Sequence, residues 1–460
     1  MSRKHWLGQF EIFTAALIVR IVYHLTRLTN IGEGTNFPGR IVLTLFPNLV
    51  SLLVPRFKNG WVTITGTNGK TTTTKILVEL MREHGWRVTT NARGANLVAG
   101  IVTSILLDEL NLSAPYMADY AVFEIDEAVL IKSFRLFQPK LLVITNFSRD
   151  QLDRYGEVDS NVNRIMDLIR DAQQECNVVL NGNDPNIARI GAVVSAENRL
   201  YFGLKEEIAA VEAGLLVEKD TGASTDFEVS NLPNLDIWAE TLRVDYLNGC
   251  RFNLGYQQQL VEVKTKLPGV FNTLNVLAAA AVCLHLGGDM ERVKKVIGEV
   301  TPSYGRSERF ECGGFPIFLF LVKNPVGFNH ILQLLSQSPG DKRILLLLND
   351  LPADGKDVSW IWDVSLENLW KVSGIKEIVT SGTRAGDMAL RVKYSNPPEV
   401  PLTVDYSTKR AFHELANHLQ PGEQMIVLAN YTSMIQFRPY LLRVCGRKTK
   451  IEHSPKKVVV

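Results

Sequence analysis

One short segment constrains the fold of this chain more than any other, the loop Thr65-Gly66-Thr67-Asn68-Gly69-Lys70-Thr71. An apolar, strand-like run, Trp61–Thr65, leads into it, and a helical run from Thr72 to Glu83 follows it. A strand, a glycine turn and a helix start in this order present backbone N–H groups to an anionic phosphate. The segment therefore predicts a nucleotide-phosphate site on an α/β fold, with a chance glycine turn as the alternative.

The side chains of this loop fit phosphate chemistry. Lys70 would neutralise charge on the β- and γ-phosphates, and Thr71 would offer its hydroxyl to magnesium. The spacing departs from the common GxxxxGK[ST] pattern, because Gly66 and Gly69 are only three residues apart. The residues expected to contact ATP here are Gly66, Thr67, Asn68, Gly69, Lys70, Thr71 and Thr72.

Three further apolar runs end in polar residues and alternate with helical runs: Tyr120–Ile125, Lys140–Thr145 and Asn177–Leu180. This order is typical of parallel strands in a doubly wound sheet, whose ligands gather at the carboxyl ends of the strands. The first run ends in an acidic cluster that includes Glu124. Magnesium favours carboxylates combined with phosphate oxygens and water, so we expect Glu124 to ligate it. A solvated acidic turn, with Asp126 and Glu127, is the alternative.

The pattern changes twice beyond residue 204. Short alternating segments between residues 205 and 265 predict a small antiparallel insert, and the helix Thr273–Leu286 returns to the first domain. A second α/β pattern begins near Arg309. Its expected strands are Ile317–Phe320, Ile344–Leu348, Glu377–Val379 and Met425–Leu428. The expected division is an N-terminal helical segment (1–37), a nucleotide-binding domain (38–305), a C-terminal α/β domain (306–445) and a basic tail (446–460).

Composition excludes some classes of protein. The 460 residues are 46% hydrophobic and 21% charged, with a net charge of +2, which is typical of a soluble globular protein and argues against a nucleic-acid binder. The five cysteines are scattered and form no CxxC pair, which favours a reducing cytoplasm over a disulfide framework or a local zinc site. The basic stretch from Arg447 to Lys457 is expected to be a solvated tail.

The N-terminus carries an apolar stretch, Phe10–Val22, that Glu11 and Arg20 interrupt. A spanning helix needs about 20 mostly apolar residues, so this stretch is a poor candidate. No small-residue cleavage site follows it, which argues against a signal peptide. We expect an amphipathic helix packed on the first domain, with a helix resting on the membrane surface as the alternative.

The loop from Gly66 to Thr72 resembles that of the Mur ligase superfamily, as does Gly269-Val270-Phe271-Asn272 with Asn275 and the alanines after it. Further motifs narrow the resemblance to the MurT family, the ligase subunits of lipid II isoglutaminyl synthase. These motifs are Asn96, Glu124–Glu127, Thr145–Glu157 and the tryptophan-rich Ala353–Asp363. The resemblance implies a Mur-ligase-like central ATPase domain with a doubly wound, mostly parallel sheet, followed by a C-terminal α/β domain.

The resemblance also implies a reaction. In this family ATP phosphorylates the α-carboxylate of D-glutamate in the lipid II stem peptide, and ammonia then displaces the phosphate to leave an amide. Phosphorylation supplies the leaving group that a carboxylate lacks, and Lys70 with magnesium would stabilise the transferring phosphoryl group. Lys70 and Glu124 are therefore expected catalytic residues, with Thr71 and Glu124 holding magnesium. The remaining expected nucleotide contacts are Asn146, Asn181, Asp184 and Arg306, although Asn and Asp at strand ends can equally be turn formers.

The ammonia must come from a glutaminase, and the five cysteines here carry no local Cys/His signature of one. The resemblance implies a separate GatD-like partner in a heterodimer. An aspartate of the ligase subunit completes the partner's catalytic triad in this family, and the matching residue is Asp357. Asp354 and Asp363 lie nearby and could instead cap turns or helices.

One departure from the family concerns zinc. Many MurT proteins carry two cysteine pairs that form a zinc ribbon, whereas the equivalent stretch here, about residues 203 to 250, has only Cys250. We therefore expect no zinc site, and an insert that holds together by packing alone. Arg384 is a further candidate phosphate contact, whereas His285 and His330 are expected to serve packing or surface roles.

Two other functions stay open at this point. One is a single-chain Mur-type ligase that adds an amino acid, and the other is a nucleotide-binding scaffold without catalysis. The presence of Lys70, Thr71, Glu124 and Asp357 together disfavours the scaffold. The leading expectation is a cytoplasmic enzyme that acts on lipid II, at the inner face of the membrane if the N-terminal helix makes a peripheral contact, and that binds no nucleic acid.

Overall fold

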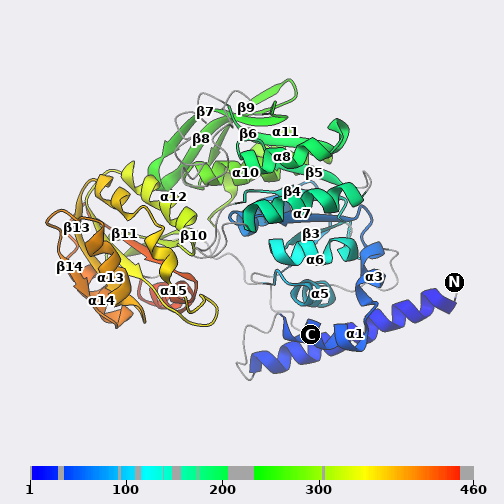
Figure 1. Ribbon diagram of the computed structural model, residues 1–460, viewed down its shortest axis with the longest axis horizontal. Helices are drawn as coiled ribbons and strands as arrows, with labels where there is room; N and C mark the ends of the chain where they lie inside the picture. The colour runs from blue at the N-terminus through cyan, green and yellow to red at the C-terminus, as the bar shows by residue number, and fades with distance from the viewer. Residues whose placement is uncertain are drawn as a thin grey trace.

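The computed structural model describes residues 3–28, 36–91, 95–108, 116–137, 139–147, 157–172, 176–205, 233–302 and 306–445. Two sheets, each covered by helices on both faces, organise these residues (Figure 1). Several segments singled out in the sequence lie outside the described residues. They are residues 148–156 of the family motif, residues 206–232 of the expected insert, Tyr304 and Gly305, and the basic tail.

The first sheet has nine strands among the described residues, in the order β2-β3-β1-β4-β5-β6-β7-β8-β9. The strands are β1 (Trp61–Thr65), β2 (Val88–Thr90), β3 (Tyr120–Glu124), β4 (Leu141–Ile144), β5 (Asn177–Asn181), β6 (Arg199–Leu204), β7 (Ile237–Asp245), β8 (Gly249–Tyr256) and β9 (Gln259–Thr265). Neighbours from β2 to β7 pair in parallel, whereas β7, β8 and β9 pair antiparallel. The parallel part is the doubly wound sheet expected from the apolar runs.

Helices bury both faces of this sheet. One face packs against α4 (Lys70–Glu83), α10 (Val270–His285) and α11 (Met290–Glu299), which form one apolar core. A second core lies on the opposite face. Its helices are α1 (Arg3–Leu28), α2 (Phe37–Leu45), α3 (Leu49–Leu53), α5 (Val98–Leu107), α6 (Glu127–Phe137), α7 (Glu157–Asp171) and α8 (Pro185–Ile190). Burial on both faces explains why the central strands read as continuous apolar runs.

The second sheet has the order β10-β11-β15-β12-β13-β14, parallel except for β10 at its edge. Its strands are β10 (Arg306–Cys312), β11 (Phe315–Leu321), β12 (Lys342–Leu347), β13 (Ile375–Ser381), β14 (Leu402–Val404) and β15 (Gln424–Ala429). The helices on its faces are α12 (Pro325–Ser336), α13 (Ala385–Tyr394), α14 (Thr408–Asn417) and α15 (Tyr431–Cys445). The strand β10 was not foreseen, because an antiparallel edge strand with charged residues lacks a continuous apolar run.

The strands within the expected antiparallel insert join the first sheet. The strands β7, β8 and β9 are antiparallel to one another, as expected, but β7 pairs in parallel with β6. They therefore extend the first sheet. Pairing with β6 satisfies backbone groups that an isolated insert would leave as a second unpaired edge.

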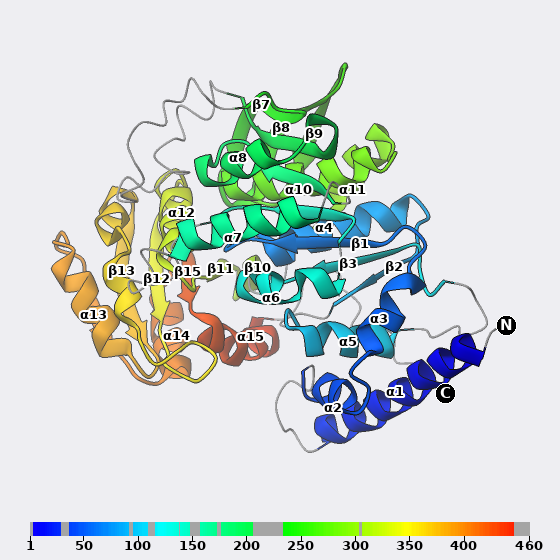
Figure 2. The same cartoon turned by 45° about the vertical axis from the view of Figure 1, so that its right-hand side comes forward.

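The first sheet and its helices are called the first unit below, and the second sheet and its helices the C-terminal unit. The N-terminal helix α1 packs along the outside of the first unit, beside α2 and α5 (Figures 1 and 2). Ile12, Ala15, Ala16 and Val19 are at most 3% exposed, so one side of the helix belongs to the second core. The window Leu7–Thr26 is nevertheless long and apolar enough to cross a membrane by length and composition, and 22% of it is buried in the protein.

The two units meet along α12. His330 stacks on Phe271 of α10 with 5.8 Å between ring centroids and 3° between ring planes, so it serves the packing role expected for it. Leu247, between β7 and β8, joins the core that covers one face of the second sheet. A third contact, between Asn324 and Asn68, brings α12 to the phosphate loop.

Candidate active site

The phosphate loop joins β1 to α4, as the sequence predicts. Gly66 and Gly69 have φ angles of +128° and +88°, in the region that only glycine adopts readily. A Cβ on Gly66 would lie 2.2 Å from Oγ1 of Thr145, and one on Gly69 would lie 2.1 Å from Oδ1 of Asn275. Both glycines are therefore needed for backbone geometry and for close packing of the loop.

The start of α4 faces this loop without a side-chain cap, since its N-cap residue is Gly69 in the left-handed conformation. The first N–H groups of a helix have no intrahelical partner and carry the positive end of the helix dipole. Thr71 and Thr72 belong to this first turn. The geometry is that of an anion site built from backbone.

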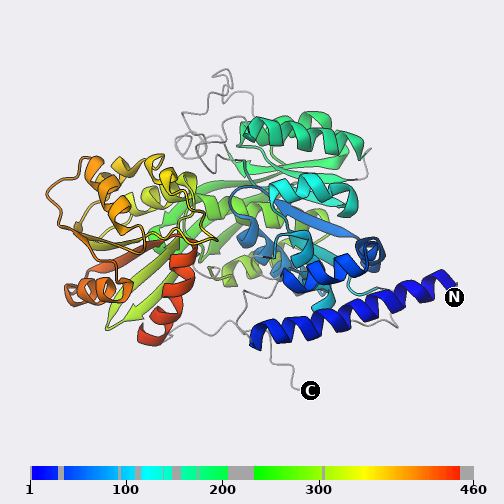
Figure 3. The ribbon, with the colours of Figure 1, turned by 60° about the horizontal axis from the view of Figure 1, so that its bottom comes forward.

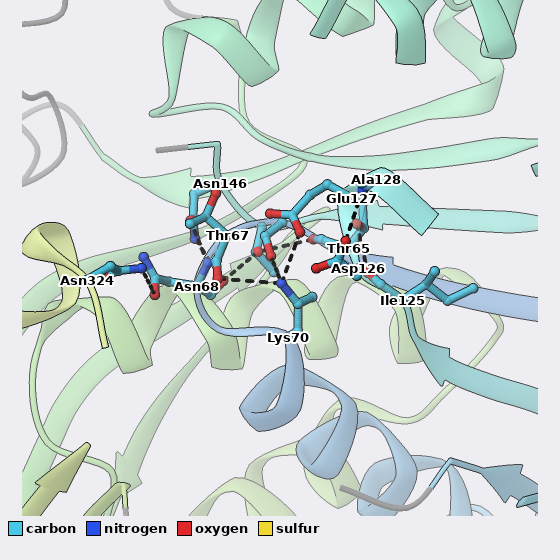
Figure 4. A network of polar contacts seen from close by, with 12 residues as sticks. Thr65, Thr67, Asn68, Lys70, Ile125, Asp126, Glu127, Ala128, Asn146 and Asn324 are labelled. Carbon is cyan, nitrogen blue, oxygen red and sulfur yellow. Dashed lines mark hydrogen bonds and ion pairs between the residues drawn. The ribbon is translucent and has the colours of Figure 1, made fainter. Parts of the chain in front are cut away.

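Lys70 bends back over the loop (Figure 4). Its ammonium donates to the carbonyl oxygen of Gly66 and lies 3.2 Å from Oε2 of Glu127, with both charged side chains largely buried. It also lies 3.5 Å from the carbonyl oxygen of Thr67. The cation therefore sits at the centre of the loop, where phosphate charge would have to be neutralised.

The strand end of β4 braces the loop from the other side. Asn146 accepts a hydrogen bond from the Asn68 N–H at 3.0 Å and returns one to the Asn68 carbonyl at 3.0 Å. Thr145 donates to the same carbonyl at 2.7 Å. The side chain of Asn146 thus positions Asn68, and it lies at the site where the sequence predicts it (Figure 4).

Glu124 ends β3, directly beside β1, with Ile64 as its register partner. Its side chain is 6% exposed, and its Oε2 atom has no hydrogen-bond partner within the described part of the chain. A buried carboxylate oxygen without a partner is costly unless a cation or donor completes it. Its neighbour Glu127 instead forms an ion pair with Lys70. The two glutamates of the acidic cluster therefore have different contacts.

Asn91 holds Glu124 in place and was not foreseen. Its amide accepts from the Glu124 N–H at 3.0 Å and donates to the Glu124 carbonyl at 2.9 Å and to the Ala95 carbonyl at 2.9 Å. Asn91 follows β2, so the rule that polar residues at strand ends line ligand sites could have found it.

Asn181 and Asp184 contact the residues on either side of Asn146. Asn181 donates to the Thr145 carbonyl at 3.1 Å. Asp184 caps α8 and accepts from the Phe147 N–H at 3.2 Å, which anchors the segment that follows Asn146. Burial raises the pKa of Asp184 to about 6, against backbone hydrogen bonds that lower it. Both side chains make such contacts, so they support the segment around Asn146 that holds the loop.

The candidate basic residues of the C-terminal unit stand apart from these contacts. Arg306 begins β10, and its side chain lies outside the described residues. Arg384 lies 3.7 Å from Asp350 and 3.4 Å from Asp387, both within its own unit. His285 is half-buried at the end of α10, and burial lowers its pKa.

The tryptophan-rich segment presents Asp357 on the surface. Its carboxylate accepts from the Ser359 N–H at 2.8 Å, and this hydrogen bond lowers its pKa. Asp354 instead accepts hydrogen bonds from the N–H, at 2.9 Å, and the hydroxyl of Thr432 at the start of α15. Asp363 is partly buried after the short helix Ser359–Trp362. Of the three, Asp357 is the exposed carboxylate.

The cysteines contribute no metal centre to the described part of the chain. Cys250 is buried beside the Gly269 carbonyl, at 3.7 Å, and burial raises its pKa to about 11. No group of three or more histidine, cysteine or acidic side chains with metal-binding geometry occurs in the residues described.

Comparisons with known proteins identify the class. Solved structures with the same architecture include the MurF ligase from Thermotoga maritima in complex with ADP, with a TM-score of 0.66 and 17% identity, covering 87% of this chain and 83% of that one. Crystal structure II of MurF from Acinetobacter baumannii gives a TM-score of 0.64 and 19% identity, covering 88% and 80%. The chain therefore has the Mur ligase fold.

Sequence comparison narrows this class. A family model for the Mur ligase middle domain matches residues 64–283, and one for the MurT ligase C-terminal domain matches residues 321–434. The chain is 31% identical over 434 residues to the lipid II isoglutaminyl synthase (glutamine-hydrolyzing) subunit MurT of Streptococcus pneumoniae, covering 90% of this chain and 94% of that protein. The subunit of the same name from Staphylococcus aureus strain COL is 30% identical, with 89% and 95% covered. The chain belongs to the MurT family of Mur ligases, and it is a ligase enzyme.

Proposed function

We propose that this chain is the ATP-dependent ligase subunit that amidates the α-carboxylate of D-glutamate in the lipid II stem peptide. The observation that carries the proposal is near full-length similarity to proteins named as the MurT subunit of a glutamine-hydrolyzing lipid II isoglutaminyl synthase. The phosphate loop and the buried Glu124 supply the matching chemistry. The proposal includes the expected division into an N-terminal helical segment (1–37), a nucleotide-binding domain (38–305) and a C-terminal α/β domain (306–445).

In the proposed reaction, the acceptor carboxylate attacks the γ-phosphate of ATP, and ADP leaves. The loop N–H groups and Lys70 hold the phosphates, because they combine backbone donors with a central cation. The ammonium of Lys70 exchanges its contacts with loop carbonyls and Glu127 for phosphate oxygens. Ammonia then attacks the acyl carbon, phosphate leaves, and the amide loses a proton.

Magnesium fits this site, because Glu124 offers a buried carboxylate oxygen without a partner in the described residues. Glu124 and the hydroxyl of Thr71 would hold the ion together with phosphate oxygens. A bound magnesium ion would supply charge neutralisation on the phosphates. Asn91 fixes the strand end that carries Glu124, so it acts as a positioning residue.

The ammonia source in this proposal is a GatD-like glutaminase subunit in a heterodimer. The word "subunit" in the names of the relatives supports a second chain. Asp357 is the carboxylate proposed to orient the partner's histidine, since it is exposed whereas Asp354 is held by Thr432. The proposed location is the cytoplasm, at the inner face of the membrane where lipid II is made available.

The decisive experiment is reconstitution of this chain with a glutaminase encoded beside it. Glutamine-dependent ATP hydrolysis and amidation of lipid II are expected, and ammonium salts should replace glutamine. Addition of an amino acid to a soluble precursor by the chain alone would instead favour a Mur-type amino acid ligase. Binding of ATP with neither activity would favour the scaffold.

A further inference from the structure

The helix α1 carries two apolar sides. One side is buried against the first unit through Ile12, Ala15, Ala16 and Val19. The other is exposed, and its apolar residues recur at spacings of three or four residues, the period of one helix face. These exposed residues, each 48–82% exposed, are Leu7, Phe10, Phe13, Leu17, Ile21, Leu25 and Leu28.

We infer that this exposed stripe of α1 is a docking surface for an anionic membrane, on which the helix lies in the plane of the bilayer. At 1.5 Å per residue, α1 is about 39 Å long, and the stripe runs along most of it. Exposed apolar patches of this size on a soluble protein mark interaction sites. Figure 3 shows α1 along the outside of the molecule.

The neighbouring helix α2 also carries exposed apolar residues. Phe37 and Leu45 of α2, which packs on α1, are 55% and 57% exposed. A helix that lies in a membrane interface buries its apolar face about 5–10 Å into the boundary between headgroups and acyl chains.

The charges of α1 favour a lipid surface over a second copy of the chain. The helix contains four basic residues, Arg3, Lys4, Arg20 and Arg27, and one acidic residue, Glu11, and α2 adds the exposed Arg40. Cytoplasmic membrane surfaces are anionic, and each nearby Lys or Arg strengthens binding to them. Two copies meeting through this stripe would oppose like charges.

The buried side of α1 argues against a helix that crosses the membrane. Crossing would remove Ile12, Ala15, Ala16 and Val19 from the core of the first unit. It would also break the hydrogen bond of 3.1 Å from Arg20 to the Asp108 carbonyl. An in-plane helix keeps both, and it still uses the outer stripe.

Only the biological purpose of the membrane binding rests on the proposed function. A ligase whose acceptor is anchored in a bilayer gains from being held at that surface, because its encounters are confined to the same plane. The binding itself involves neither ATP nor lipid II, so it is measured separately from catalysis.

The test is co-sedimentation of the full chain with vesicles, without ATP or lipid II. Wild-type protein should pellet with phosphatidylcholine vesicles that contain phosphatidylglycerol, and several-fold less with phosphatidylcholine alone or in high salt. The triple variant Phe10→Ser, Leu17→Ser, Ile21→Ser should partition at least tenfold more weakly. A matched variant, Leu136→Ser, Leu260→Ser, Leu390→Ser, removes exposed leucines from α6, β9 and α13 and should behave as wild type.

Four outcomes overturn the inference. In the first, wild-type protein stays in the supernatant with anionic vesicles, and in the second, the triple variant pellets like wild type. In the third, vesicle-bound protein resists extraction with alkaline carbonate, as a spanning helix does. In the fourth, wild-type protein binds no vesicles but forms a dimer that the triple variant does not form. Vesicle binding that the triple variant weakens, without glutamine-dependent amidation by the reconstituted complex, would contradict the proposed function. The inference of a membrane-docking surface would still hold.

Discussion

Asn324, at the N-cap of α12, donates its side-chain amide to Oδ1 of Asn68 in the phosphate loop at 3.3 Å (Figure 4). Asn324 is completely buried, and its own Oδ1 caps α12 by accepting from the Gly327 N–H at 2.8 Å. One side chain therefore links the position of the C-terminal unit to the loop that would hold phosphate.

Asn324→Ser tests this link. Serine keeps a capping oxygen for α12 but cannot reach Asn68. The free energy of unfolding should therefore fall by only about 1 kcal/mol, the contribution of one hydrogen bond. The KM for ATP should rise several-fold, because Asn68 loses a partner on the side facing α12. Steady-state ATP hydrolysis and thermal unfolding measure the two effects. An unchanged KM would show that Asn68 is positioned by Asn146 and Thr145 alone.

Lys70→Ala should reduce ATP hydrolysis by about 10²-fold or more, because one preorganised charged donor contributes that much to transfer chemistry. The fold should persist, since the loop keeps its glycines and its bonds to Asn146. Lys132→Ala, on the exposed side of α6, is the matched control and should leave hydrolysis unchanged. Wild-type turnover by Lys70→Ala would refute the phosphate-loop assignment.

Glu124→Gln should weaken the magnesium dependence of ATP hydrolysis and lower its rate by about 10²-fold, since the amide keeps the shape but loses the charge of a metal ligand. Its thermal stability should equal or exceed that of wild type, because an unpartnered buried carboxylate oxygen is removed. A magnesium titration of the rate measures the effect. Asp126→Asn is the control, and an equal loss there would assign the metal to the whole cluster.

Asp357→Asn should abolish glutamine hydrolysis by the reconstituted complex, with a loss of about 10⁴-fold, because the amide cannot stabilise the partner's imidazolium. Amidation driven by high ammonia should continue. Asp354→Ala is the matched control: it should lower the thermal stability by removing the acceptor for Thr432, and glutamine hydrolysis should remain. Loss of ammonia-driven amidation in Asp357→Asn, with glutamine hydrolysis spared, would move Asp357 to the ligase site.

Asp184 predicts a pH dependence of stability. Its pKa in the folded protein is about 6, above the ordinary 3.8, so the folded state binds its proton more tightly than the unfolded chain. Its contribution to stability therefore falls as pH rises from about 4 to about 6, by roughly 3 kcal/mol, and is constant above that range. The melting temperature of wild type relative to Asp184→Asn should decrease across this window. A constant difference would show that Asp184 titrates normally.

Local pattern was sufficient to predict the strand, turn and helix on which the candidate site is built. Gly66, Gly69 and Lys70 were recognisable because a phosphate loop is a contiguous segment, and Glu124 because it ends an apolar strand. The parallel order of the central strands also followed from continuous apolar runs, since strands buried on both faces need apolar residues at every position.

The tertiary structure decided the relationships that no contiguous segment encodes. Asn91 and Asn324 both follow strands in the sequence, but only the fold brings them to Glu124 and Asn68. The pairing of β7 with β6 is likewise a choice between sheet edges that residues in β7 do not specify. In α1, the interrupted apolar stretch predicted an amphipathic helix, but only packing determined which apolar side is buried and which is left exposed. The reason is common to all four cases: hydrogen-bond partners and burial depend on residues distant in the chain, which backbone propensity and local hydrophobic period do not record.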